Sequence, residues 1–232
     1  MFNFKDTWVL GIDTSSQVNV GLAHNGNLMV SRGVGDSRSH VELLARATNA
    51  VLADCELAYA NLTAIGVGVG PGPFTGLRVG IAAAETLGFA LGIPVIGVCS
   101  LDVLAAQYAD LGAESGFVVA MDARRKELYW AEYDQYGTRL GEPQVGAPDT
   151  LPELPTLGPG VAKYPEVLGE RVPFGAPVSM DAGFLAAQLR NLPQLPLTPL
   201  YLREPDAEAP SRRKSVLVSP LRTATAAGAG GE

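Results

Sequence analysis

The sequence is poor in the residues that most often bind metal ions or act as nucleophiles. Its 232 residues include two cysteines, Cys55 and Cys99, and two histidines, His24 and His40. The histidines form no HExxH or HxxxH motif, so a structural or catalytic metal is not expected. A G-x-S-x-G motif is also absent, which argues against a serine hydrolase. Two cysteines predict free thiols in a reducing compartment, not a disulfide framework.

Charged residues and long apolar runs are also scarce. Hydrophobic residues make up 47% of the chain and charged residues 18%, which excludes a disordered protein and allows a sizeable core. Every 18-residue window contains a charge or a glycine or proline break, and the N-terminus lacks a signal-peptide pattern. We therefore expect a cytoplasmic protein without a membrane segment.

The formal net charge of −7 predicts that any nucleic acid is held with the help of a partner.

The segment from Gly66 to Gly92 joins a buried strand, a Pro-Gly turn and a helix with an unusual four-residue spacing. One ridge of this helix consists of Gly76, Gly80, Ala84, Gly88 and Gly92. An interior glycine costs about 1 kcal/mol of helix propensity, so the ridge indicates close approach of another backbone. Two interpretations remain open at this point. The helix packs on its own sheet, or the ridge is a docking face for another chain.

The first half of the chain predicts three antiparallel strands followed by alternating helices and strands. Asn25-Gly26 is a strong hairpin signal, and Ser39 and Glu42 form a capping box at a helix start. This helix is apolar around more of its circumference than one sheet contact needs. We expect strands over residues 7–13, 16–24, 28–33 and 94–98 and near Ile65, and helices over 39–54, over 75–91 and from Ser100.

The pattern restarts near residues 112–116. Strands are predicted over 117–122, 127–134 and 138–145. Short helical or irregular segments are predicted over 149–154 and 163–168, and a clearer helix over 180–192. The repeated order predicts an α/β protein with a two-lobed actin-like ATPase fold (the ASKHA, RNase H-like class), each lobe a mixed β-sheet flanked by helices. The predicted divisions are a first lobe over 1–110, a smaller second lobe over 111–203 and a flexible tail over 204–232.

Two loops are candidates for phosphate chemistry. Asp13, Thr14, Ser15 and Ser16 follow the first strand, and we interpret them as a vestigial phosphate loop, with a polar hairpin turn as the alternative. In the second lobe, Asp122 is followed by Ala123 and three cations, where a working clamp would need glycine and hydroxyl residues. That difference argues against an active kinase or ATPase. The cations form either a solvated turn or an anchor for an acidic partner.

A third loop, over residues 70–76, precedes the long helix and must be considered as a P-loop. A P-loop requires lysine and then serine or threonine after its last glycine. Here Gly76 is followed by Leu77 and Arg78, so the pattern fails. Arg78 is expected to make a surface contact.

Several longer stretches resemble the bacterial TsaB family, also called YeaZ. They are LGIDTSS at 10–16, SHVELL at 39–44, GVGPGPFTGLRVGIAAAETLGFAL at 68–91, PVIGVCSLDVLA at 94–105, MDARRKELYWAEY at 121–133 and PLYLR at 199–203. The run around GPGPFTGLRVG is the most specific. Pro73 stands where the family usually has serine.

The resemblance implies a non-catalytic dimerisation subunit in the synthesis of N6-threonylcarbamoyladenosine at position 37 of tRNA. It implies pairing with a TsaD-type paralogue or with a second copy, recruitment of a TsaE-type ATPase, and indirect contact with tRNA. No cofactor is implied, although ATP or ADP at the partner junction is an open question. The alternative is an active ATPase, kinase or glycoprotease-like peptidase. The resemblance and the glycine ridge together imply a set of partner-interface positions. They are His40, Val41, Leu43, Leu44, Ala47, Gly76, Arg78, Gly80, Ala84 and Gly88.

Overall fold

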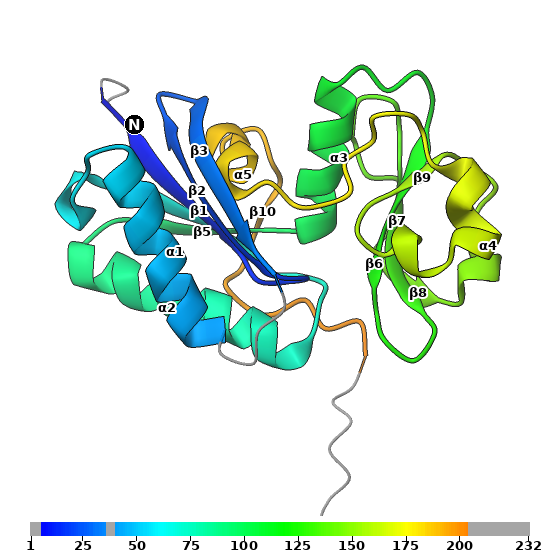
Figure 1. The fold of residues 1–232 in the computed structure, drawn as a ribbon, viewed down its shortest axis with the longest axis horizontal. Helices are drawn as coiled ribbons and strands as arrows, with labels where there is room; N and C mark the ends of the chain where they lie inside the picture. The colour runs from blue at the N-terminus through cyan, green and yellow to red at the C-terminus, as the bar shows by residue number, and fades with distance from the viewer. Residues whose placement is uncertain (1–5, 36–39, 204–232) are drawn as a thin grey trace, which may run out of the picture.

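Two β-sheets organise the chain in the computed structural model, which describes residues 6–35 and 40–203 (Figure 1). The first sheet has the strand order β10-β5-β4-β1-β2-β3, and the second has the order β8-β7-β6-β9. The strands of the first sheet are β1 (Trp8–Asp13), β2 (Val18–His24), β3 (Asn27–Val34), β4 (Ala64–Gly68), β5 (Val95–Val98) and β10 (Gln194–Leu195). Two mixed α/β lobes are therefore present, as predicted.

The first sheet is covered by helices on both faces. Strands β1, β2 and β3 are antiparallel, whereas β4 and β5 run parallel to β1. The helices α1 (His40–Asp54) and α2 (Phe74–Leu91) cover one face, and α5 (Ala182–Gln188) covers the other (Figure 1). The predicted strands and helices of residues 7–110 are confirmed to within about two residues. Ser39 of the predicted capping box lies outside the described residues.

A row of three glycines crosses the first sheet beneath α5. Gly11 pairs with Gly21 on one side and with Gly66 on the other. A Cβ atom at Gly11 would lie 1.9 Å from the carbonyl oxygen of Ala182, and one at Gly21 would lie 2.2 Å from the backbone nitrogen of Gly183. Because no Cβ fits, the absence of side chains lets the backbone of α5 lie directly on the strands.

The predicted boundary of the second lobe needs correction. Residues 111–203 were expected to form one unit, but α5 packs on β1, β2 and β3, and β10 pairs with β5. The chain therefore leaves the first lobe, builds the second sheet, and returns to complete the first. Local sequence patterns give no sign of this return, because an amphipathic helix can cover either sheet. The predicted tail over 204–232 lies outside the described residues.

The second sheet is small. Its strands are β6 (Phe117–Asp122), β7 (Leu128–Tyr133), β8 (Gln144–Gly146) and β9 (Thr156–Leu157). The predicted continuous strand over 138–145 is wrong: an isolated bridge joins Tyr133 to Arg139, and β8 begins only at Gln144. Gly141, within the predicted strand, adopts a positive φ angle of 95°, which interrupts an extended strand.

The short helical or irregular segments predicted in the second half are confirmed, whereas the longer helix over 180–192 is shorter than expected. Residues 148–150 and 161–163 form single 3₁₀ turns, and α4 spans Pro165–Leu168. The predicted helix over 180–192 is α5, which begins after Asp181. The carboxylate of Asp181 accepts a hydrogen bond from the backbone N–H of Phe184 over 3.0 Å, which is a normal N-cap.

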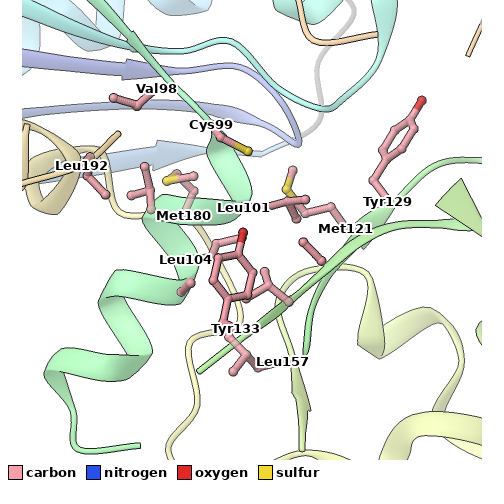
Figure 2. Packing of buried hydrophobic residues seen from close by; sticks show 14 of the residues in the cluster. Val98, Cys99, Leu101, Leu104, Met121, Tyr129, Tyr133, Leu157, Met180 and Leu192 are labelled. Atoms are coloured by element: carbon pink, nitrogen blue, oxygen red, sulfur yellow. The ribbon is translucent and has the colours of Figure 1, made fainter. Parts of the chain in front are cut away.

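One hydrophobic cluster runs from the first lobe into the second (Figure 2). Its centre is α3 (Ser100–Asp110), whose residues Leu101 and Leu104 are fully buried. Tyr133 and Leu157 from the second sheet and Met180 from the segment before α5 pack against it. The lobes therefore share a core, so the second lobe is not an independent unit joined by a linker.

Candidate docking groove and a closed carboxylate loop

An apolar groove lies between α1 and α2 on the outer face of the first lobe. It has a volume of about 820 Å³. Arg78, at one end, is a charged residue among otherwise apolar and small polar side chains. The lining residues are Ile12, Val41, Leu44, Ala45, Thr48, Tyr59, Phe74, Thr75, Arg78, Val79, Ala82, Ala83, Thr86, Leu87, Ala90 and Leu91. An exposed apolar concavity of this size is typical of a docking surface.

The glycine ridge of α2 does not line this groove. Gly76, Gly80, Ala84 and Gly88 are buried. A Cβ atom at Gly80 would lie 2.2 Å from Thr14 Oγ1, and one at Gly88 would lie 2.2 Å from Val95 Cγ2. The ridge therefore packs on the loop after β1 and on β5 of its own lobe, and its interpretation as a docking face is wrong. The spacing correctly indicated a close backbone approach, because a Cβ atom at Gly76 would lie 2.6 Å from the carbonyl oxygen of Thr14, but the chain itself supplies that backbone.

The other predicted interface residues fall into three groups. Val41 is 67% exposed and lines the groove, as does Arg78, whereas Leu44 forms its buried floor. Leu43 and Ala47 point instead toward the core of the first lobe. His40 begins α1, but its side chain lies outside the described residues.

The groove positions on α2 that the sequence analysis missed follow a regular pattern. Ala82, Thr86 and Ala90 recur every fourth residue on the exposed side, and Val79, Ala83 and Leu87 form the adjacent row. An apolar row opposite a glycine ridge is the signal that would have identified this face. By length and composition α2 is also the one helix in the described chain that could cross a membrane. Its buried ridge and its groove face account for that composition within the fold.

The loop after β1 is closed by its own chain. The Asp13 carboxylate is fully buried. Its Oδ1 accepts hydrogen bonds from the hydroxyl of Ser15 over 2.6 Å and from the Ser15 backbone N–H over 2.9 Å, and its Oδ2 accepts one from the Ser100 hydroxyl over 2.6 Å. Burial raises the pKa of Asp13, and the hydrogen bonds from Ser100 and Ser15 offset part of that increase.

The end of β4 and the turn that follows it cover the Asp13 carboxylate. A Cβ atom at Gly68 would lie 1.9 Å from Asp13 Oδ2, and Gly72 lies against the backbone of Ser15. The Thr14 hydroxyl donates to the carbonyl oxygen of Gly76 over 2.8 Å. Of the four predicted phosphate-loop residues, only Ser16 is exposed. These residues do not fit a metal-bound phosphate, because both carboxylate oxygens are already hydrogen-bonded and sealed from solvent.

A second buried carboxylate joins the lobes. The Tyr133 hydroxyl donates to Asp102 Oδ1 over 2.7 Å, and Arg139 Nη1 lies 3.5 Å from the same oxygen. Burial raises the pKa of Asp102, with Tyr133 and Arg139 opposing it, and burial raises the pKa of Cys99 to about 12. The Cys99 thiol therefore stays protonated at neutral pH. Cys99 and Cys55 are both free, which confirms the prediction that they form no disulfide.

No group of three or more potential metal ligands occurs within residues 6–35 and 40–203. His24 lies 2.9 Å from Asp6 and stacks on Trp8 at the opposite end of β1 from Asp13. His24 therefore belongs to a surface contact.

Comparisons with known proteins agree on one family. The family model for TsaD, tRNA N6-adenosine threonylcarbamoyltransferase, matches residues 35–195. An uncharacterised protein of Mycobacterium tuberculosis is 42% identical over 208 residues, with 86% of this chain and 93% of that protein covered. A counterpart from Mycobacterium leprae is 41% identical, with 86% of this chain and 56% of that protein covered. The tRNA threonylcarbamoyladenosine biosynthesis protein TsaB of Escherichia coli is 31% identical, with 58% of this chain and 59% of that protein covered.

The solved structures support the same grouping. YeaZ from Pseudomonas aeruginosa superimposes with a TM-score of 0.65 at 28% identity, covering 84% of this chain and all of that protein. The predicted fold class is therefore confirmed. The chain spans slightly more than half the length of the Mycobacterium leprae and Escherichia coli relatives.

Proposed function

This chain belongs to the TsaB (YeaZ) branch of the TsaD family, and from that premise we propose that it is a non-catalytic docking subunit in the synthesis of tRNA threonylcarbamoyladenosine. Its proposed partner is a TsaD-type paralogue, and a TsaE-type ATPase joins the pair. Contact with tRNA is indirect, and the proposed compartment is the cytoplasm. Pairing with a second copy of the chain is the alternative in the absence of the paralogue.

The groove between α1 and α2 is the observation that carries the proposal. Ala82, Thr86 and Ala90 are exposed along its length, so a partner helix can approach the α2 backbone closely. Burying this apolar surface favours association, whereas its exposure in an isolated subunit would promote aggregation. The acidic net charge fits a subunit that leaves most tRNA contact to its partner.

A charge placed in the groove is expected to prevent docking while leaving the fold intact. Ala82 is exposed, and glutamate is a good helix former, so Ala82→Glu should not destabilise α2. In the complex the new carboxylate would be buried in an apolar contact, and Arg78 one turn away is already engaged by Tyr201 and Phe74, so binding should weaken at least about a hundredfold. Co-expression with a TsaD-family protein, followed by size-exclusion chromatography and calorimetric titration, measures this loss.

Glu85→Gln is the matched control, since Glu85 is exposed on the same helix but does not line the groove. It should pair as tightly as the unmodified chain. Equal affinity of the Ala82→Glu and Glu85→Gln variants would show that docking uses another surface. Loss of self-association alone, with TsaD pairing intact, would assign the groove to the homodimer.

The same proposal predicts that the isolated chain has no ATPase or peptidase activity. Asp13 is the residue that an actin-like ATPase would need, and its carboxylate is engaged by Ser15 and Ser100. We expect no turnover of ATP above a buffer control, and no cleavage of a casein substrate. ATP hydrolysis that disappears in Asp13→Asn would instead support the rival proposal of an active enzyme.

A further inference from the structure

A small pocket lies where the two lobes and the closing segment of the chain meet. Its volume is about 210 Å³. The first lobe contributes the turn before α2, the second lobe contributes the loop after β6, and residues 201–203 complete the lining. Its lining residues are Gly72, Pro73, Phe74, Ala123, Arg124, Arg125, Tyr129, Tyr201, Leu202 and Arg203. Three of these residues are arginines, in a protein whose net charge is −7.

Two of the arginines, Arg203 and Arg124, are held from different directions. Arg203 donates from Nη1 to the carbonyl oxygen of Ala123 over 3.1 Å and pairs with Glu127. The side chain of Arg124 is 70% exposed, and its Nε lies 3.6 Å from Asp122 Oδ2. The same Asp122 oxygen also pairs with Lys163. One carboxylate shared by two cations does not neutralise both, so the groups around Asp122 carry excess positive charge next to the pocket.

An aromatic stack fixes the first-lobe side of the pocket. The rings of Phe74 and Tyr201 are stacked with their centroids 4.5 Å apart. The Arg78 guanidinium lies 3.7 Å from the centroid of Phe74, and its Nε donates to the Tyr201 hydroxyl over 3.0 Å. These contacts hold the closing segment against α2 and so keep Arg203 beside the loop of the second lobe. The pocket is therefore pre-formed, which reduces the ordering cost of binding.

We propose that this pocket binds a single phosphate group, with Arg124, Arg125 and Arg203 as its ligands. Guanidinium groups donate paired hydrogen bonds that match the geometry of phosphate oxygens. A volume of about 210 Å³ suits one phosphate and is too small for a whole nucleotide. A metal-bound triphosphate is disfavoured because Asp13 is sealed behind the turn containing Gly72. The pocket shares Phe74 with the docking groove, but none of its three arginines lines that groove.

Titration of the full chain with inorganic phosphate, followed calorimetrically at about 0.15 M ionic strength, tests the proposal. We expect saturable binding of one phosphate per chain that weakens with added sodium chloride. The double variant Arg124→Gln, Arg125→Gln should bind at least about tenfold more weakly, because it loses charge-assisted hydrogen bonds. Arg32→Gln, which removes an exposed arginine on β3, is the matched control and should bind normally.

Absence of saturable binding, or equal affinity in the double variant and the control, would overturn the proposal. Parallel titrations with adenosine monophosphate and with a single-stranded RNA lacking terminal phosphates identify the source of the phosphate. Tighter binding of the RNA, lost in the double variant, would identify a backbone phosphate, whereas preference for the small molecules would identify a free phosphate. Phosphate binding should persist in Ala82→Glu, so this test fails or succeeds separately from the docking proposal.

Discussion

Replacement of Gly80 by leucine is expected to destabilise the first lobe strongly. The new Cβ would lie 2.2 Å from Thr14 Oγ1, and the larger side chain would displace the Thr14 hydroxyl from its 2.8 Å hydrogen bond to Gly76. Overpacking costs about 1–3 kcal/mol, and a broken buried hydrogen bond adds about 1–3 kcal/mol. Together these remove a large part of a typical stability of about 5–15 kcal/mol.

Denaturant unfolding monitored by circular dichroism measures this loss, and Ala82→Leu is the matched control. Both variants add a leucine side chain to the middle of α2, but Ala82 is on the exposed groove side. The control should unfold within about 0.5 kcal/mol of the unmodified chain. A Gly80→Leu variant that is folded, with an unchanged midpoint, would contradict the packing of α2 against Thr14.

Replacement of Asp13 by alanine is expected to have the second-largest effect. It would leave the hydroxyls of Ser15 and Ser100 and the Ser15 N–H without their acceptor in a buried site. Unsatisfied buried donors cost about 1–3 kcal/mol each, although relaxation of the serine hydroxyls reduces the sum. We expect a loss of about 2–4 kcal/mol in the free energy of unfolding. Asp13→Asn keeps the side-chain shape and one acceptor oxygen, so its free energy of unfolding should be closer to that of the unmodified chain.

The pH dependence of stability provides an independent check on Asp13. Because burial raises its pKa above the ordinary value of 3.8, the folded state holds this proton more tightly than the unfolded state. Stability should therefore fall as the pH rises from about that value through the folded-state pKa, and then level off. Unfolding of the unmodified chain and of Asp13→Asn across this range isolates the effect. Identical pH profiles would mean that burial does not shift the Asp13 pKa.

The strands and helices of the first lobe could be predicted because their patterns are local. Val18, Val20 and Leu22 alternate along β2, and Asn25-Gly26 fixes the hairpin that follows. The four-residue glycine spacing also carried real information, since α2 does approach a backbone closely. It could not say which backbone, because a glycine ridge has the same appearance whether its neighbour belongs to the same chain or to another.

The parts that could not be predicted depend on long-range contacts. Asp13 and Ser100 are separated by 87 positions, so nothing near Asp13 indicates that its carboxylate is enclosed. The docking groove combines residues from α1 and α2, and the phosphate pocket combines three segments that are far apart in the sequence. Residue types indicated candidate residues for the Asp13 loop, the docking groove and the phosphate pocket, but only the fold decides which of those side chains face solvent.

The return of α5 and β10 to the first sheet also has a consequence for synthesis on the ribosome. Strands β1, β2 and β4 emerge early, but the helix that covers Gly11, Gly21 and Gly66 is not translated until residues 182–188. Until then the nascent chain exposes the apolar sheet surface that α5 covers in the finished protein. The first part of this protein to be made is therefore among the last to be finished.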